Sequence, residues 1–289
     1  MKITDAAQLH KIAFTLRQDI LAMIYQAQSG HPAGSLGMID LILTLYASGI
    51  LRHDSKRPRW EKRDYFLLSN GHICPALYAV LAQQKYFARE ELETFRQIDS
   101  RLEGHPHFLM NGQTVDKKTV EGIEITSGSL GHGSSQAAGL AYGLQMDNKK
   151  NHVFCLLSDG EQQEGQTWEA YMFAAHQRLK NLTFIIDYNH IQISGNTQAV
   201  MSLGNLKLKL IAFGLHVLEM DAHDFADIQK KLQQAKNNQQ QTVAIIAHST
   251  PGKGVSFMEN DYRWHGQVPN KKEFESAMNE LRIKKQDLK

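Results

Sequence analysis

The spacing of apolar residues divides the chain into alternating helices and buried strands. Between residues 5 and 28, apolar residues such as Leu9, Leu16 and Ile20 recur at helical spacing, which predicts an amphipathic helix. Further helices are predicted over residues 38–48, 75–85 and 134–144. Short continuous apolar runs, typical of strands buried on both faces of a parallel sheet, occupy residues 65–69, 152–157, 182–186, 215–218 and 242–247. The alternation predicts an α/β fold with a mostly parallel sheet flanked by helices.

Polar and glycine-rich segments separate these elements. The Ser-Gly-His-Pro of residues 29–32 is expected to end the first helix, because glycine and proline break helices. Residues 52–63 predict a basic surface loop, and residues 236–241 predict a polar turn without a function. Residues 97–125 are irregular, and a loop of this length is more often functional than idle. No internal repeat or linker is visible, so residues 1–289 are expected to form one domain.

The composition narrows the classes of function. The formal net charge of +2 gives no electrostatic reason to expect a nucleic-acid or membrane partner. The N-terminus lacks an apolar secretory core, and no apolar run is long enough to span a membrane. Cys74 and Cys155 lie far apart in apolar contexts, so buried thiols and a cytoplasmic location are expected. The 14 histidines are numerous for a chain of 289 residues.

Polar residues just past two neighbouring apolar runs predict a divalent cation site. Asp159 follows the run at 152–157, and Asn189 follows the run at 182–186. The two side chains and the backbone carbonyl of Ile191 offer the oxygen ligands that Mg²⁺ or Ca²⁺ prefers. Gly160 would let a diphosphate approach the backbone closely. An ordinary Asp-Gly turn is the alternative interpretation of this segment.

The Asp-Gly pair and the later asparagine resemble the signature of thiamine diphosphate enzymes, although that family usually has glycine where Ser158 stands. The Gln163-Glu164-Gly165 that follows resembles the transketolase family in particular. Further segments resemble transketolase loops at residues 29–37, 68–72, 103–106, 126–133 and 264–266. These matches extend the resemblance over nearly the whole chain. Together these motifs are highly specific.

The resemblance implies a role for each matching residue. His31, His105 and His265 would line a substrate channel and act in catalysis, because histidine exchanges protons near neutral pH. Glu164 would act at a dimer contact between active sites, and it also suits a helix N-terminus. Cofactor contacts are implied for His72, Gly128, Leu130, Asp159, Gly160, Asn189 and His265, with His132 nearby. The remaining histidines are interpreted as structural: His10, His53, His107, His152, His176, His190, His216, His223 and His248.

A complete transketolase is more than twice as long as this chain and has a pyrimidine-binding domain that no segment here resembles. The resemblance therefore implies the N-terminal, diphosphate-binding subunit of a split transketolase, with thiamine diphosphate and Mg²⁺ or Ca²⁺ as cofactors. It would transfer a two-carbon ketol group from a ketose, often phosphorylated, to an aldose. The expected partner is a separate C-terminal subunit with the pyrimidine-binding domain, in an α2β2 heterotetramer.

Other kinds of function stay open at this point. Another thiamine diphosphate enzyme, such as deoxyxylulose phosphate synthase or a decarboxylating dehydrogenase subunit, would share the cation site at Asp159 and Asn189. Residues 103–106 and 163–165 favour transketolase. A non-catalytic cofactor-binding scaffold is the alternative from a different class, and Ser158 supports it. A dinucleotide site is not expected, because no Gly-x-Gly-x-x-Gly follows a predicted strand with an acidic residue at the required distance.

Overall fold

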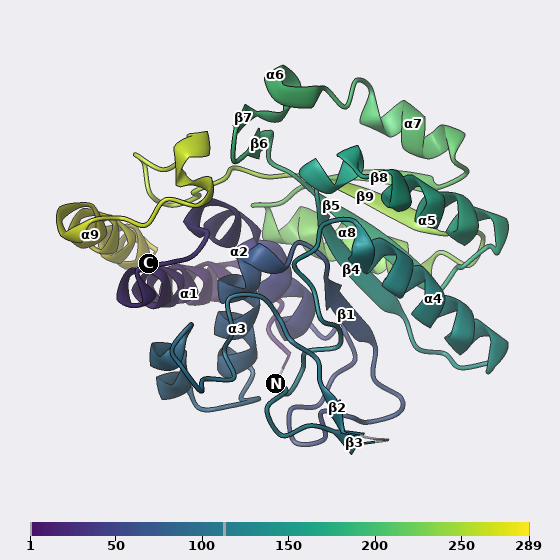
Figure 1. Ribbon diagram of the computed structural model, residues 1–289, viewed down its shortest axis with the longest axis horizontal. Coiled ribbons are helices and arrows are strands. Elements are labelled where there is room, and N and C mark those ends of the chain that lie inside the picture. Colours follow the sequence, from purple (N-terminus) through teal and green to yellow (C-terminus); the bar gives the residue numbers. More distant parts are fainter. Residues whose placement is uncertain (1, 112–113, 289) are drawn as a thin grey trace.

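The computed structural model describes residues 2–111 and 114–288, which fold around a five-stranded sheet (Figure 1). All neighbouring strands of this sheet are parallel, so their carboxyl ends lie at the same edge. The prediction of an α/β fold with a mostly parallel sheet is confirmed. In spatial order the strands are β1 (Tyr65–Leu68), β4 (Val153–Ser158), β5 (Leu182–Tyr188), β9 (Val243–His248) and β8 (His216–Asp221).

Side chains of the buried strands alternate between two hydrophobic cores, one on each face of the sheet. Cys155 and Leu157 of β4 pack in the core with α4 (His132–Met146), α5 (Gly165–His176) and α7 (Leu206–Ala212). Phe154 and Leu156 pack in the other core, which contains α1 (Ala6–Ala27), α2 (Pro32–Ala47), α3 (Cys74–Gln83) and α8 (Phe225–Asn237). Burial on both faces explains why these strands are continuously apolar in sequence.

Helix α2 begins at Pro32, earlier than the predicted start at residue 38. Proline is favoured at the first helical position because its φ is already helical and its missing N–H is not needed there. Gly34 lies inside the helix because space is short: a Cβ at this position would be 2.7 Å from Ile73 Cγ2. Gly34 is therefore a packing position. The early start makes His31 the N-cap residue of a buried helix.

Shorter elements complete the described part of the chain. Two short antiparallel pairs join β2 (Met110–Asn111) with β3 (Thr114–Val115) and β6 (Ile191–Gln192) with β7 (Gly195–Asn196). None of the helices within residues 2–111 and 114–288 has the length and apolar character needed to cross a membrane. The remaining elements are η1 (Gly71–Ile73), η2 (Arg89–Thr94), η3 (Gly160–Gln163), α6 (Thr197–Met201), η4 (Tyr262–His265) and α9 (Lys271–Asp287).

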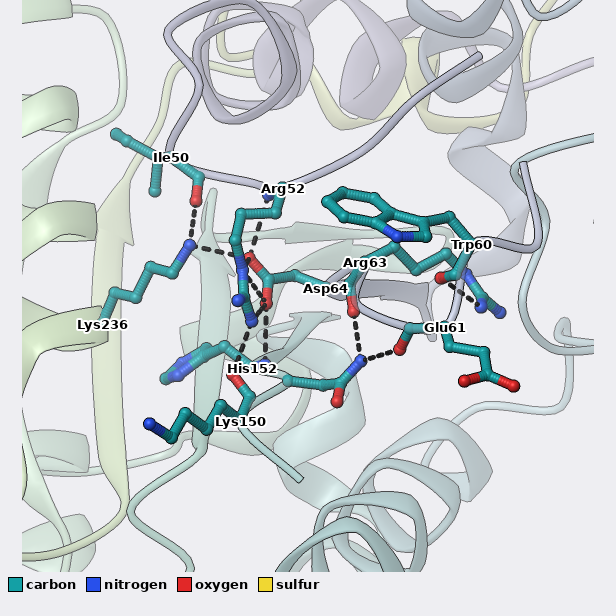
Figure 2. A network of polar contacts seen from close by, with 10 residues as sticks. Ile50, Arg52, Trp60, Glu61, Arg63, Asp64, Lys150, His152 and Lys236 are labelled. Atoms are coloured by element: carbon teal, nitrogen blue, oxygen red, sulfur yellow. Dashed lines mark hydrogen bonds and ion pairs between the residues drawn. The ribbon is translucent and has the colours of Figure 1, made fainter. Parts of the chain in front are cut away.

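Asp64, just before β1, ties the amino edge of the sheet to three neighbouring segments (Figure 2). Its carboxylate accepts hydrogen bonds from Arg52 Nη2 at 2.6 Å, from the backbone N–H of His152 at 2.9 Å and from Lys236 Nζ at 2.7 Å. The ammonium of Lys236 also donates to the carbonyl of Ile50. The predicted polar turn over residues 236–241 is thus wrong at its start, because Lys236 belongs to α8 and makes a partly buried ion pair with Asp64.

Candidate functional site

The parallel register brings the motif loops together at the carboxyl edge of the sheet. His72 follows β1, Asp159 follows β4 and Asn189 follows β5, and these three strands are neighbours. The backbone N–H of Asp159 donates to the carbonyl of Asp187 at 3.0 Å, which joins the ends of β4 and β5. The short helix η4, which carries His265, packs against α2 and β6. Ligands of open α/β sheets bind at this edge.

Asp159 is a buried carboxylate with one oxygen free of protein partners. Its Oδ2 accepts from the backbone N–H of His190 at 2.8 Å and from Thr197 Oγ1 at 3.2 Å. Its Oδ1 is buried without a hydrogen bond. Burial, followed by the neighbouring charge of Asp187, raises the pKa of Asp159 to about 7. A cation at Oδ1 would offset the cost of burying this charge, so Asp159 fits the predicted role of a metal ligand.

Asn189 and Ile191 flank His190, whose backbone N–H donates to Asp159, in the segment that leaves β5 and begins β6. The side-chain amide of Asn189 donates to Asp187 Oδ2 at 2.9 Å, and its Oδ1 accepts from the backbone N–H of Ile191 at 2.9 Å. These contacts fix the amide orientation and leave Oδ1 with acceptor capacity. A Cβ at Gly160 would have only Ser158 Oγ within 4 Å, at 3.8 Å, so a ligand has room to approach the backbone there.

The donor set suits a hard cation held jointly with a diphosphate. In the described residues, no three or more His, Cys, Asp or Glu side chains are grouped to hold a metal. A cation would therefore use one carboxylate, one amide and a carbonyl from this chain, with phosphate and water oxygens as further ligands. Magnesium is usually bound in this way. We refer to Asp159, Asn189 and Ile191 as the clamp.

Four predicted histidines converge on one cluster, although they come from distant parts of the chain. The ring of His31 lies 5.1 Å from that of His72, 6.4 Å from that of His105 and 5.6 Å from that of His265, between centroids. The rings of His72 and His265 are 5.1 Å apart. The sequence placed these residues on separate loops, and the fold brings their rings together in one cluster.

The histidines of this cluster are neutral at pH 7. Burial, followed by the charges of His265, Arg96 and His105, lowers the pKa of His31 to about 4. Burial also lowers the pKa values of His72 and His265, and burial together with Arg96 lowers that of His105. Neutral imidazoles both donate and accept hydrogen bonds, which suits groups that exchange protons with sugar hydroxyls.

We expect Arg96→Gln to raise the pKa values of His105 and His31, because it removes a positive charge that disfavours their protonated forms. The histidines would then become protonated at a higher pH. Titration of labelled imidazoles by NMR measures this shift. Arg101→Gln is the matched control, since Arg101 lies near Arg96 in sequence but pairs with Glu91 and Glu121. Equal pKa values in wild type and Arg96→Gln would contradict the prediction.

Three further residues of the site were missed by sequence reasoning. Asn70 is fully buried, and neither polar atom of its side chain has a partner. Ser127 Oγ and Arg96 Nε are likewise buried without a hydrogen bond, while other nitrogens of Arg96 donate to Ser29 and to the carbonyl of Gly104. Buried polar groups are normally paired, so these atoms indicate a polar ligand. Asn70 and Ser127 lie in the matched segments 68–72 and 126–133, which could have indicated them, whereas Arg96 lies outside the matched segments.

The loop of residues 126–133 lies beside the histidine cluster. A Cβ at Gly128, where φ is +137°, would be 2.9 Å from His105 Cδ2. Leu130 is half-buried, and its carbonyl accepts from Gln166 Nε2 at 3.1 Å. His132 is exposed at the first residue of α4. These positions agree with the predicted cofactor contacts of Gly128 and Leu130, which stay predictions, as does the proximity of His132.

Glu164 is the exposed N-cap residue of α5 and does not cap the helix with its side chain. A Cβ added at Gly131 would lie only 2.8 Å from the Cβ of Glu164, so the start of α5 packs tightly against the 126–133 loop. The carboxylate is therefore available to a partner chain. Its predicted action at a dimer contact stays a prediction.

Glu161 joins three loops of the site and explains Ser158. The fully buried carboxylate accepts from Ser69 Oγ, from the backbone N–H of Gly131 at 2.8 Å and from the backbone N–H of Ser158 at 2.8 Å. In return, Ser158 Oγ accepts from the backbone N–H of Glu161 at 3.2 Å. The serine at the usual glycine position thus stabilises the turn after β4 and leaves Asp159 in place.

Two of the histidines interpreted as structural, His152 and His53, have partners typical of that role. His152 is buried, its Nε2 lies 2.9 Å from Thr183 Oγ1, and burial lowers its pKa to about 3. The ring nitrogens of His53 lie 3.0 Å from the hydroxyl of Tyr86 and 3.0 Å from the carbonyl of Tyr46. None of these contacts involves the clamp or the histidine cluster.

Comparison with known proteins identifies similar chains and folds. Residues 9–287 match the family described as transketolase, thiamine diphosphate binding domain. The chain is 37% identical over 265 residues to one of the subunits of apulose-4-phosphate transketolase from Phocaeicola vulgatus, covering 92% of this chain and 90% of that protein. It is also 37% identical over 269 residues to a 6-deoxy-6-sulfo-D-fructose transketolase subunit of a Clostridium species, covering 93% and 94%.

A solved structure gives the same fold. Transketolase from Leishmania mexicana superimposes with a TM-score of 0.83 at 26% sequence identity. The match covers 97% of this chain but 45% of that one, so the chain spans less than half the length of this single-chain relative.

Proposed function

The chain belongs to the transketolase family and carries its thiamine diphosphate-binding domain, and from this premise we propose the reaction and the partner. The chain transfers a two-carbon ketol group from a ketose, often phosphorylated, to an aldose, as the N-terminal subunit of a two-chain enzyme. The observation that carries the proposal is the cluster of four histidines beside the clamp at one edge of the sheet. A scaffold that only bound the cofactor would not need such a cluster.

The residues of the site divide into two groups with different tasks. Asp159, Asn189 and the carbonyl of Ile191 would hold the divalent cation, Mg²⁺ or Ca²⁺, and through it the diphosphate. Thiamine diphosphate, when bound, would supply the nucleophilic chemistry needed at a ketose carbonyl. The neutral rings of His31, His105 and His265 donate and accept protons at the sugar oxygens, and His72 contacts the diphosphate region. Glu164 acts between active sites at the contact with another chain.

The proposed partner is a separate subunit with a pyrimidine-binding domain, in an α2β2 heterotetramer. Two relatives that match over most of their length are named as subunits. Exposed apolar side chains near the clamp support a covering partner: Ile193 lies between β6 and β7, and Met201, whose carbonyl accepts from Gln163, ends α6. Residues 1–289 act as one diphosphate-anchoring domain, and the complex works in the cytoplasm, where Cys74 and Cys155 stay reduced.

Reconstitution tests this proposal. We expect the purified chain alone to show no ketol transfer, and we expect activity to appear on adding a partner that supplies the pyrimidine-binding domain, thiamine diphosphate and Mg²⁺. Donor ketoses should include a phosphorylated and a sulfonated sugar, since relatives are named for both kinds. Transfer by the chain alone would contradict partner dependence. Cofactor binding without transfer in every combination would favour the scaffold instead.

A further inference from the structure

A buried ionic network lies outside the clamp and the histidine cluster. Arg17 of α1 and Asp40 of α2 are almost fully buried, and Arg17 Nη2 donates to Asp40 Oδ2 at 2.7 Å. His223, which follows β8, places Nδ1 2.9 Å from the same oxygen. The proposed reaction uses none of the three residues. Burying such a network costs free energy, so a specific purpose is expected of it.

The network holds one segment of the chain, residues 249–254, which we call the connecting segment. The backbone N–H of Thr250 donates to His223 Nε2 at 2.8 Å. Because Nε2 accepts, the proton of the neutral ring is on Nδ1, which donates to Asp40. Arg17 Nε donates to the carbonyl of Lys253 at 2.9 Å. The network therefore hydrogen-bonds to the connecting segment at both ends, through His223 and through Arg17.

The connecting segment contacts both functional groups of the site. Ser249 Oγ donates to Asp187 Oδ1, and the other oxygen of Asp187 holds the amide of Asn189. The backbone N–H of Gly252 donates at 2.8 Å to the carbonyl of Ala33, in the first turn of α2 after His31. The segment thus bridges the clamp and the helix whose N-cap residue belongs to the histidine cluster.

We propose that His223 and Asp40 are positioning residues, which act through the connecting segment to hold the clamp and the histidine cluster in their relative places. This inference rests on the proposed function for its purpose, but its geometry does not depend on catalysis. His223 sets the position of Thr250, and the adjacent Ser249 then orients Asp187 and Asn189. Partners that orient metal ligands in this indirect way strongly influence metal affinity.

Hydrogen exchange of the full chain without cofactor tests the first step. We expect His223→Ala to accelerate exchange in the connecting segment roughly five- to tenfold, because one of its anchoring hydrogen bonds is lost. His223→Gln should restore part of the protection, since an amide can donate to Asp40 and accept from Thr250. His152→Ala is the matched control, as it removes another buried histidine with a hydrogen bond far from this segment. Unchanged exchange in His223→Ala, or equal acceleration in His152→Ala, would overturn the proposal.

Metal affinity tests the second step. Mg²⁺ is titrated calorimetrically into the chain, together with its partner and excess thiamine diphosphate. We expect His223→Ala and Ser249→Ala each to lower the affinity for Mg²⁺ about tenfold. The double variant should lose less affinity than the product of the two single losses, because both residues act along one path. Multiplicative losses, or wild-type affinity in His223→Ala, would refute the path. If the complex fails to transfer ketol groups but these binding results hold, the proposed reaction is refuted and the positioning role is not.

Discussion

Asp159→Ala should abolish metal-dependent binding of thiamine diphosphate while leaving the fold largely intact. The substitution removes the carboxylate of the clamp, whose Oδ1 is buried without a protein partner. Since changing residues that merely orient a metal ligand already costs about 10–100-fold in affinity, losing the ligand itself should cost more than about a hundredfold. Calorimetry with thiamine diphosphate, with and without Mg²⁺, measures the loss.

Two companion variants make this experiment specific. Asp159→Asn keeps an oxygen for the backbone N–H of His190 but loses the charge, so it should fold and still bind the metal poorly. Asp147→Asn changes an exposed carboxylate just after α4, outside the clamp and the histidine cluster, and should bind the cofactor normally. Wild-type affinity in Asp159→Ala would refute the metal assignment. Equal losses in Asp159→Asn and Asp147→Asn would point to general electrostatics instead of coordination.

The family and the architecture could be predicted from sequence because their signals are local. The runs at 152–157 and 182–186 are continuously apolar since β4 and β5 are buried on both faces, and each motif follows its strand directly. The expectation that the chain belongs to the transketolase family and carries its thiamine diphosphate binding domain is confirmed. The histidine loops carried that resemblance, and the structure adds that four of their rings meet.

Features that depend on packing between distant segments could not be predicted. Helix α2 was predicted to begin at residue 38, yet it begins at Pro32 and includes Gly34, which is required by the approach of Ile73 that only the fold reveals. Arg96 has no motif around it, and its relevance comes from its influence on the pKa values of His31 and His105. His223 was interpreted as structural, and its link to the clamp passes through a backbone N–H that no sequence pattern records.

Glu161→Ala should cause the largest loss of stability among single substitutions at the site. Three buried donors, on Ser69, Gly131 and Ser158, would lose their shared acceptor, and a cavity would replace the side chain. Each unsatisfied buried donor costs about 1–3 kcal/mol of stability. Because the surrounding loops can relax and recover part of this cost, we expect the free energy of unfolding to fall by about 3–5 kcal/mol. Denaturant unfolding at pH 8 measures it. Burial raises the pKa of Glu161 and its hydrogen bonds lower it, so an alkaline buffer keeps the carboxylate ionised.

Glu161→Gln separates the hydrogen bonds from the volume of the side chain. The amide nitrogen is a donor and must face at least one of the three donors, so about 2 kcal/mol of stability should be lost without a cavity. Glu169→Gln, at an exposed position of α5, should change stability by less than about 0.5 kcal/mol. Wild-type stability in Glu161→Gln would mean that the carboxylate is protonated in the folded chain. If stability is lost as expected, cofactor binding should also weaken in Glu161→Gln. The side chain of Glu161 holds together the loop after β1, the loop after β4 and the loop before α4.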